Sequence, residues 1–240
     1  MRPHCGRILI QVVLSRRSGI MKNVGMISVT LNAVNPMMKL FSEKAVSQNP
    51  FTVINYLDEG LQELVAKEGK VTDKSLSRMK IIIENAIQDG AEIILLTCTV
   101  FSPFIDLFNK SFSVPVISVD GAMLDKAAAM NRSTAILCTF PATVETSKHV
   151  FMAAAKKQGV DPRVDIFLLE DAARANKAGN KEDHDRIIAR EAEKMSSGYD
   201  LIVLAQISMA GAKAYIKDCS KPVLTSPECV FAALENSFPE

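Results

Sequence analysis

The sequence predicts an α/β fold built on parallel sheets. Short runs rich in Val, Ile and Leu alternate with longer segments of helical periodicity, the pattern expected of buried parallel strands joined by crossover helices. Residues that commonly begin or end helices stand at the borders of the longer segments. The two halves of the chain are also similar in sequence, which predicts two lobes with the same fold.

Eight runs are predicted to be strands, because each is short and consists largely of Val, Ile and Leu. In chain order they are Val24–Val29, Thr52–Tyr56, Glu92–Thr97, Pro115–Val119, Thr134–Cys138, Val164–Leu168, Leu201–Ala205 and Pro222–Thr225.

Helices are expected between these strands, and the clearest cover Lys74–Asp89, His149–Gln158 and Lys181–Ser196. Asp73 and Asn180 are expected as N-caps, because their side chains can accept a hydrogen bond from a free N–H group of the first turn. Gly90 and Gly159 follow two of the helices, where glycine commonly ends a helix.

The two halves of the chain resemble each other at nearly one offset. Val24–Thr30 resembles Thr134–Phe140, Ile93–Cys98 resembles Leu201–Gln206, and Val114–Ile117 matches Lys221–Leu224. We therefore expect two flavodoxin-like lobes, residues 21–120 and 121–240, each a parallel sheet of about four strands flanked by helices. A ligand cleft would lie between them, and a last helix near Pro227–Leu234 would pack back on the first lobe. Residues 1–20 are expected to be an extension upstream of a start at Met21.

Composition argues against several partners. Lys and Arg together number 28 against 27 for Asp and Glu, so the chain carries no basic field for nucleic acid and no polybasic membrane patch. No apolar run is long enough to span a bilayer. The five cysteines are scattered without a CxxC pair and the three histidines lie far apart, so we expect reduced thiols, a cytoplasmic protein and no metal site.

The chemistry is expected at the carboxyl ends of the strands, where open parallel sheets bind their ligands. Hydroxyls and other small polar groups dominate these ends, which suits a small carboxylate that accepts N–H and O–H bonds at helix N-termini. Neither GxGxxG nor GxxxxGK[ST] occurs, so no dinucleotide or nucleotide phosphate site is indicated. The candidate substrate-binding residues are Asn32, Thr97, Thr99, Thr139, Thr143, Gln206 and Ser208.

Three segments carry a resemblance to a known family. "ILLTCTVFSP", "AILCTFPATVETS" and "DLIVLAQISMA" are similar, in that order, to the active-site segments of the aspartate/glutamate/hydantoin racemase superfamily. The resemblance covers roughly Met21 to Glu235. It implies a racemase or isomerase that needs neither pyridoxal phosphate nor another cofactor and acts on a small carboxylate-bearing compound. It also makes Cys98 the candidate catalytic residue. A homodimer is expected on general grounds, because it is the commonest assembly of soluble oligomers.

The resemblance implies acid–base chemistry by two thiols that face each other across the substrate, one of them a thiolate base. Many members carry the second cysteine where this chain has Gln206, which cannot exchange a proton. Four readings therefore stay open. They are a racemase in which another group supplies the second proton, an isomerase in which Cys98 attacks an activated alkene or carbonyl as in the maleate-isomerase-like branch, a single-thiol decarboxylase of the arylmalonate type, and a non-catalytic anion-binding protein.

Other polar or sulfur-containing residues are expected to be structural. Cys138 and the methionines Met123 and Met209 are expected in the core. His184 and its neighbours Asp183 and Asp185 stand at a charged helix start and are expected to be solvated.

Overall fold

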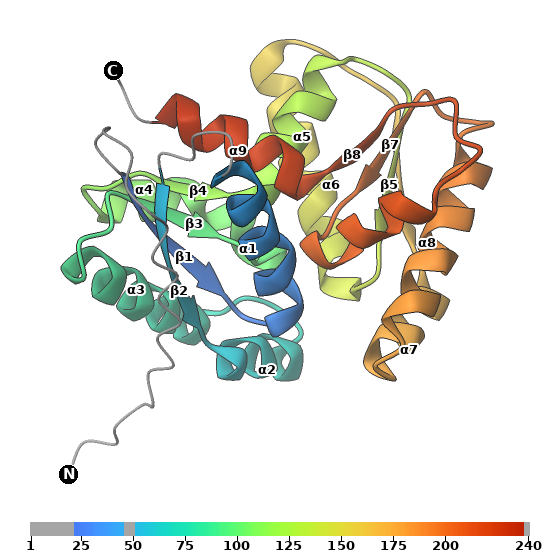
Figure 1. The fold of residues 1–240 in the computed structure, drawn as a ribbon. Coiled ribbons are helices and arrows are strands. Elements are labelled where there is room, and N and C mark those ends of the chain that lie inside the picture. The colour runs from blue at the N-terminus through green and yellow to red at the C-terminus, as the bar shows by residue number, and fades with distance from the viewer. Residues whose placement is uncertain (1–21, 46–50, 238–240) are drawn as a thin grey trace. The chain divides into compact units, whose positions relative to one another are not determined.

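A computed structural model describes residues 22–45 and 51–237 of the chain. These residues form two compact units (Figure 1). Unit 1 contains the described residues up to Thr97 together with Leu107–Ile117. Unit 2 contains Cys98–Asp106 and the described residues from Ser118 onward. The expected extension, residues 1–20, lies outside the described residues, and the expected division into 21–120 and 121–240 stays a prediction.

Unit 1 is built on a parallel sheet in the order β2-β1-β3-β4. Its strands are β1 (Lys22–Ser28), β2 (Phe51–Leu57), β3 (Ile93–Leu96) and β4 (Val116–Ser118), and its helices are α1 (Leu31–Ala45), α2 (Glu59–Glu68), α3 (Asp73–Gln88) and α4 (Ile105–Ser111). Helices α1 and α3 both pack on β1 and β2.

A close approach of backbone to helix fixes α3 on the sheet of unit 1. Gly25 lies in β1, and a Cβ placed there would come within 3.0 Å of the side chains of Ala86, Ala91 and Ile94. Only a residue without a side chain lets α3 pack this closely, which explains the glycine inside the strand.

Unit 2 repeats the same strand order, β6-β5-β7-β8, again entirely parallel. Its strands are β5 (Thr134–Cys138), β6 (Val164–Leu168), β7 (Leu201–Leu204) and β8 (Val223–Thr225). Its helices are α5 (Val119–Ala129), α6 (Pro141–Gln158), α7 (Glu170–Lys177), α8 (Lys181–Met195) and α9 (Ser226–Ser237), with the 3₁₀ helices η1 (Thr99–Phe104) and η2 (Ile207–Tyr215).

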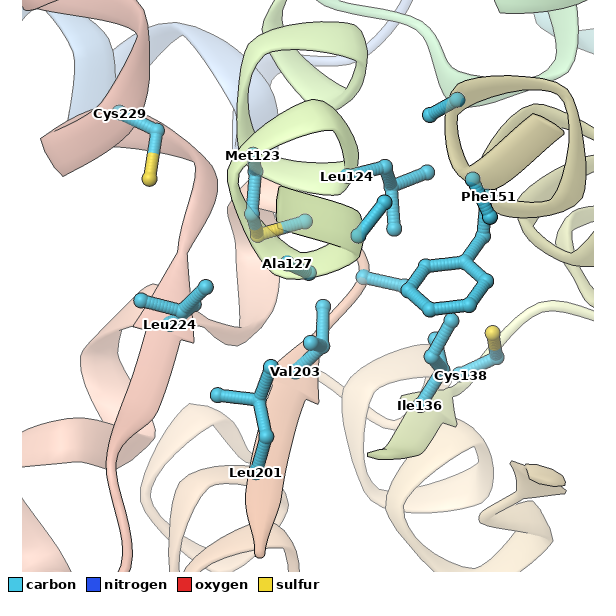
Figure 2. Packing of buried hydrophobic residues seen from close by; sticks show 14 residues of the cluster. Met123, Leu124, Ala127, Ile136, Cys138, Phe151, Leu201, Val203, Leu224 and Cys229 are labelled. Carbon is cyan, nitrogen blue, oxygen red and sulfur yellow. The ribbon is translucent and has the colours of Figure 1, made fainter. Parts of the chain in front are cut away.

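The core of unit 2 has two sides because side chains alternate across a strand. Ile136 and Cys138 of β5 point to a cluster with α5, α6 and α9, while Ala135 and Leu137 point to a cluster with α7, α8 and η2. Figure 2 shows the Phe151 ring of α6 directed toward β5 in the first cluster. Both sides of the sheet are thus covered by helices.

The structure confirms the predicted fold class, with two lobes of four parallel strands each. All eight predicted strands are present, and the identical strand order of the two sheets agrees with the repeat seen in the sequence.

Helix boundaries agree less closely with the predictions. Asn180 caps α8 as expected, by accepting a hydrogen bond from the backbone N–H of Asp183, but the N-cap of α3 is Thr72 and not Asp73. Helix α6 begins at Pro141, well before the predicted His149, because a proline at the first helical position offset the weak helix propensity of the threonines that follow. None of the described helices combines the length and the apolar character needed to cross a membrane.

Candidate active site

Cys98 stands at the start of η1, directly after the segment that follows β3. Helix η1 packs on α6 and α5, so the thiol belongs to unit 2 although β3 belongs to unit 1. The Phe101 N–H bonds back to the Cys98 carbonyl, which closes the first turn of η1 beneath the side chain. The thiol is buried, with 7% of the residue exposed.

The pKa of the Cys98 thiol is raised to about 12. Burial is the largest cause, and the charge of Asp120 makes a smaller contribution in the same direction. The backbone N–H groups of Val100 and Phe101 interact with the sulfur and act in the opposite direction. The sequence led us to expect a thiolate stabilised by helical N–H groups. Those groups are present, but loss of hydration outweighs them, so Cys98 is a protonated thiol in this state.

Asp120 is a functional candidate that the sequence analysis missed. It lies in the first turn of α5 and is only 1% exposed. The Ser226 hydroxyl donates to Oδ1 at 3.2 Å, whereas Oδ2 is buried and makes no hydrogen bond to any described residue. Burial raises the pKa of this carboxyl to about 7, against smaller opposing contributions from the hydroxyls of Thr99 and Ser226. The signal was available, because Asp120 directly follows the predicted strand Pro115–Val119.

Gln206 lies at the end of β7, as predicted, and its orientation is fixed by Thr139. The side-chain oxygen of Gln206 accepts the Thr139 N–H at 2.6 Å and the Thr139 hydroxyl at 3.0 Å. A backbone N–H can only donate, so the amide oxygen must face Thr139 and the amide NH₂ group must point away from it. This NH₂ group is a donor suited to a carboxylate.

The remaining candidates fall into two groups. Thr97 and Thr143 use their hydroxyls within the protein: Thr97 donates to the Ile27 carbonyl at 3.2 Å, and Thr143 donates to the Phe140 carbonyl at 2.6 Å. Asn32, in the first turn of α1, is exposed, and Ser208 in η2 is half-buried. All four residues stay predictions as substrate contacts.

A second buried polar atom near the thiol has no partner among the described residues. The Ser102 hydroxyl lies in η1, the same short helix that begins after Cys98, and makes no hydrogen bond there. Buried polar groups are nearly always paired, so the unpaired oxygens of Ser102 and Asp120 are available to another molecule. Within residues 22–45 and 51–237, no cluster of three His, Cys, Asp or Glu side chains could hold a metal ion.

One expectation outside the site is wrong for two of its three residues, because Asp183 is exposed but its two neighbours are not. His184 and Asp185 are buried and not solvated, and the His184 Nδ1 lies 2.8 Å from Asp185 Oδ1. Lys181 donates to the same carboxylate. The reason is helical geometry, since His184 shares a face of α8 with the buried Ile188 one turn later. Cys138, Met123 and Met209 are fully buried in the two clusters, as expected.

Residues 101–234 match the family model for Asp/Glu/hydantoin racemases, which is more than half of the 240-residue chain. The chain belongs to the Asp/Glu/hydantoin racemase family. The matched stretch includes Asp120, Thr139 and Gln206 and begins just after Cys98.

Solved structures of this family share the fold of the chain at low sequence identity. A Picrophilus torridus aspartate racemase is 16% identical with a TM-score of 0.67, over 90% of this chain and 94% of that one. An aspartate racemase homologue from Pyrococcus horikoshii OT3 is 21% identical with a TM-score of 0.66, over 90% and 99%. An allantoin racemase from Pseudomonas fluorescens is 13% identical with a TM-score of 0.58, over 89% of each chain. No curated protein sequence matches significantly.

Proposed function

We propose that this member of the racemase family is a cofactor-independent isomerase that acts on a small carboxylate-bearing compound, with Cys98 as its catalytic acid–base group. The observation that carries the proposal is the setting of Cys98. The thiol stands at the start of a helix, where the backbone N–H groups of Val100 and Phe101 lower its pKa and the charge of Asp120 raises it. A sulfur with these neighbours can exchange a proton with a carbon next to a carboxylate.

The groups around the strand ends of unit 2 suit an anionic substrate. The amide NH₂ of Gln206 is directed away from Thr139, and Ser208 follows in η2 with a hydroxyl. The buried Ser102 hydroxyl has no partner among the described residues. Each is a hydrogen-bond donor for a carboxylate, and a bond to a charged group is stronger than one between neutral groups.

A single-thiol decarboxylase is the second candidate, and two observations favour it. Gln206 occupies the position equivalent to Cys98 and cannot carry a proton, so this strand end offers no second thiol. Burial keeps Cys98 protonated, with a pKa of about 12. A protonated thiol is ready to donate to the carbanion left by loss of CO₂, whereas removal of a substrate proton needs a thiolate.

The test is turnover of a panel of amino acids, hydantoins and malonates, followed both by chirality and by release of CO₂. We expect Cys98→Ala to abolish turnover of any active compound and to leave the unfolding midpoint nearly unchanged. Cys219→Ala, which removes a half-buried thiol elsewhere in unit 2, should leave turnover intact. Survival of deuterium exchange at the substrate α-carbon in Cys98→Ala would refute the thiol assignment. Absence of turnover across the panel, with tight binding of a dicarboxylate, would favour an anion-binding protein.

A further inference from the structure

Helix α8 carries a buried charged cluster that the proposed chemistry does not use. His184 is fully buried, and Asp185 is 5% exposed. One oxygen of the Asp185 carboxylate, Oδ1, accepts a hydrogen bond from Lys181 and lies 2.8 Å from Nδ1 of His184. A carboxylate can only accept, so Nδ1 of His184 carries the hydrogen of this bond. Because burial of a charged group is costly even when it is paired, the contacts of the second carboxylate oxygen matter.

The second oxygen of Asp185, Oδ2, lies against η2. A Cβ placed on Gly211 would be 2.7 Å from this oxygen and 3.2 Å from Nζ of Lys181. A real side chain does not approach its neighbours this closely, so only glycine lets the carboxylate rest on the backbone of η2. The carboxylate cannot turn away without losing the bonds that Lys181 and His184 make to Oδ1.

Helix α8 also contacts the end of η2 and the segment that follows it. The guanidinium of Arg186 lies 5.1 Å from the centre of the Tyr215 ring, a distance typical of a cation–π contact. One carboxylate oxygen of Glu193 accepts the backbone N–H groups of Lys217 and Asp218, at 2.7 Å and 3.1 Å. Among these contacts, that of the buried carboxylate lies nearest to the start of η2.

The geometry of η2 connects this contact to a candidate substrate-binding residue. Residues three apart lie above one another in a 3₁₀ helix, so Ser208 and Gly211 share one face of η2. Met209 and Ala212 show the same spacing, since both are fully buried in the cluster that η2 forms with α8. The hydroxyl of Ser208 thus lies one turn before the glycine on which Asp185 rests.

We infer that Asp185 is a positioning residue that holds η2 where Ser208 and the main chain after Gln206 meet the substrate. This role rests on the proposed function, in which Gln206 and Ser208 bind the substrate carboxylate. Asp185 itself does not contact the substrate. It fixes the position of Gly211, and the intervening turn of η2 transmits that position to Ser208.

The first measurement is hydrogen exchange of the peptide that covers η2, because it needs no substrate. Asp185→Ala should raise the exchange rate of residues 207–215 by about tenfold or more, while the peptides of β5 and β7 stay unchanged. Asp183→Ala is the matched control, since it removes an exposed acid two residues earlier in α8. Equal exchange of η2 in the two variants would overturn the inference.

Gly211→Ala tests the same contact from η2 and leaves α8 unaltered. The added methyl group would collide with the Asp185 carboxylate, so η2 should again exchange faster. Both changes act on one contact, so the double variant Asp185→Ala/Gly211→Ala should exchange no faster than Asp185→Ala. Multiplication of the two single effects would show independent roles and contradict the inference.

Binding of malonate, measured by calorimetry, separates positioning from a merely structural role. Asp185→Ala should weaken binding by about fivefold or more, whereas loss of a negative charge alone, as in Asp183→Ala, should not weaken the binding of an anion. If Asp185 acts through Ser208, then Ser208→Ala should weaken binding less in the Asp185→Ala variant than in the wild type. Equal weakening in both backgrounds would overturn the positioning role.

The outcomes distinguish this role from the proposed function. If η2 exchange responds to Asp185→Ala but Ser208→Ala leaves malonate binding unchanged, the proposed substrate contact fails, and with it the positioning role, while the hold of α8 on η2 stands. If Ser208→Ala weakens binding but neither Asp185→Ala nor Gly211→Ala changes η2 exchange, the substrate contact holds and the positioning role fails.

Discussion

The amide oxygen of Gln206 binds Thr139 twice, once through the backbone N–H at 2.6 Å and once through the hydroxyl at 3.0 Å. The Gln206 side chain is therefore held by the end of the neighbouring strand. It performs a structural task on one side and presents an NH₂ donor on the other. These two tasks can be separated by substitution.

Replacing Gln206 by glutamate should keep the structural task and remove the donor. A carboxylate still accepts the Thr139 N–H, but it repels an anion, so malonate binding measured by calorimetry should weaken by about tenfold or more. Gln158→Glu adds the same charge at the exposed end of α6 and should leave binding unchanged. Equal weakening in both variants would show a general charge effect and not a contact by Gln206.

Replacing Gln206 by alanine should remove both tasks. The Thr139 N–H would lose its partner in a buried position, which should lower the free energy of unfolding by about 1–3 kcal/mol. Urea unfolding of Gln206→Ala beside Gln206→Glu measures this directly. Equal stability of the two variants would mean that the bond to Thr139 contributes nothing.

Stability should fall with rising pH because of Asp120. Its pKa is 3.8 when unfolded and about 7 when folded, so the folded state binds more protons between these values and loses stability as pH rises through them. The loss is complete above pH 7 and amounts to about 4 kcal/mol at most, at about 1.4 kcal/mol per pKa unit. Urea unfolding from pH 4 to pH 8 should show this slope in the wild type and not in Asp120→Asn. Asp106→Asn, at an exposed position of α4, should keep the slope.

The cluster in Figure 2 should depend on the Phe151 ring. Phe151 of α6 is fully buried in the cluster with α5 and β5, so Phe151→Ala should leave a cavity and cost about 3–5 kcal/mol of unfolding free energy. Met152→Ala, next in the helix but 40% exposed, should cost less than about 1 kcal/mol. A small effect at Phe151 would mean that the cluster can collapse around the missing ring.

Gly25→Ala should destabilise unit 1. The added methyl group would approach Ala86, Ala91 and Ile94 within 3.0 Å, and such overpacking costs about 1–3 kcal/mol. Gly198→Ala is the matched control, because a Cβ there meets nothing within 4 Å. If thermal unfolding of Gly25→Ala matches that of Gly198→Ala, α3 can shift away from β1 without loss.

The inner strands β1, β3, β5 and β7 were predictable because nearly all of their residues are buried, which leaves a mostly apolar run in the sequence. The edge strands β2 and β6 are only partly buried and include Asn55 and Asp165. Helix starts were less predictable, since Pro141 begins α6 ahead of two threonines, Thr143 and Thr146, that are poor helix formers.

The hydrogen-bond partners and the burial of several polar residues could not be predicted from the sequence pattern. Thr97 and Thr143 stay predictions as substrate contacts, but the backbone carbonyls to which their hydroxyls donate could not be predicted from the sequence. His184 was predicted to lie on a charged surface, but its four-residue spacing from the buried Ile188 places it on the buried face of α8. The thiol position of Cys98 could be read, but its pKa could not, because it depends on burial by segments distant in sequence.

The path of the chain has a consequence for modularity. The segment Cys98–Asp106 packs with unit 2, while the residues on either side of it, up to Thr97 and from Leu107, belong to unit 1. The corresponding 3₁₀ helix of the second half, η2, stays in its own unit beside α8. The two repeats thus differ in where their first 3₁₀ helix packs. Since unit 1 and unit 2 each consist of two separate stretches of chain, no single cut divides the chain into the two units, and a cut after Thr97 would leave Leu107–Ile117 joined to unit 2.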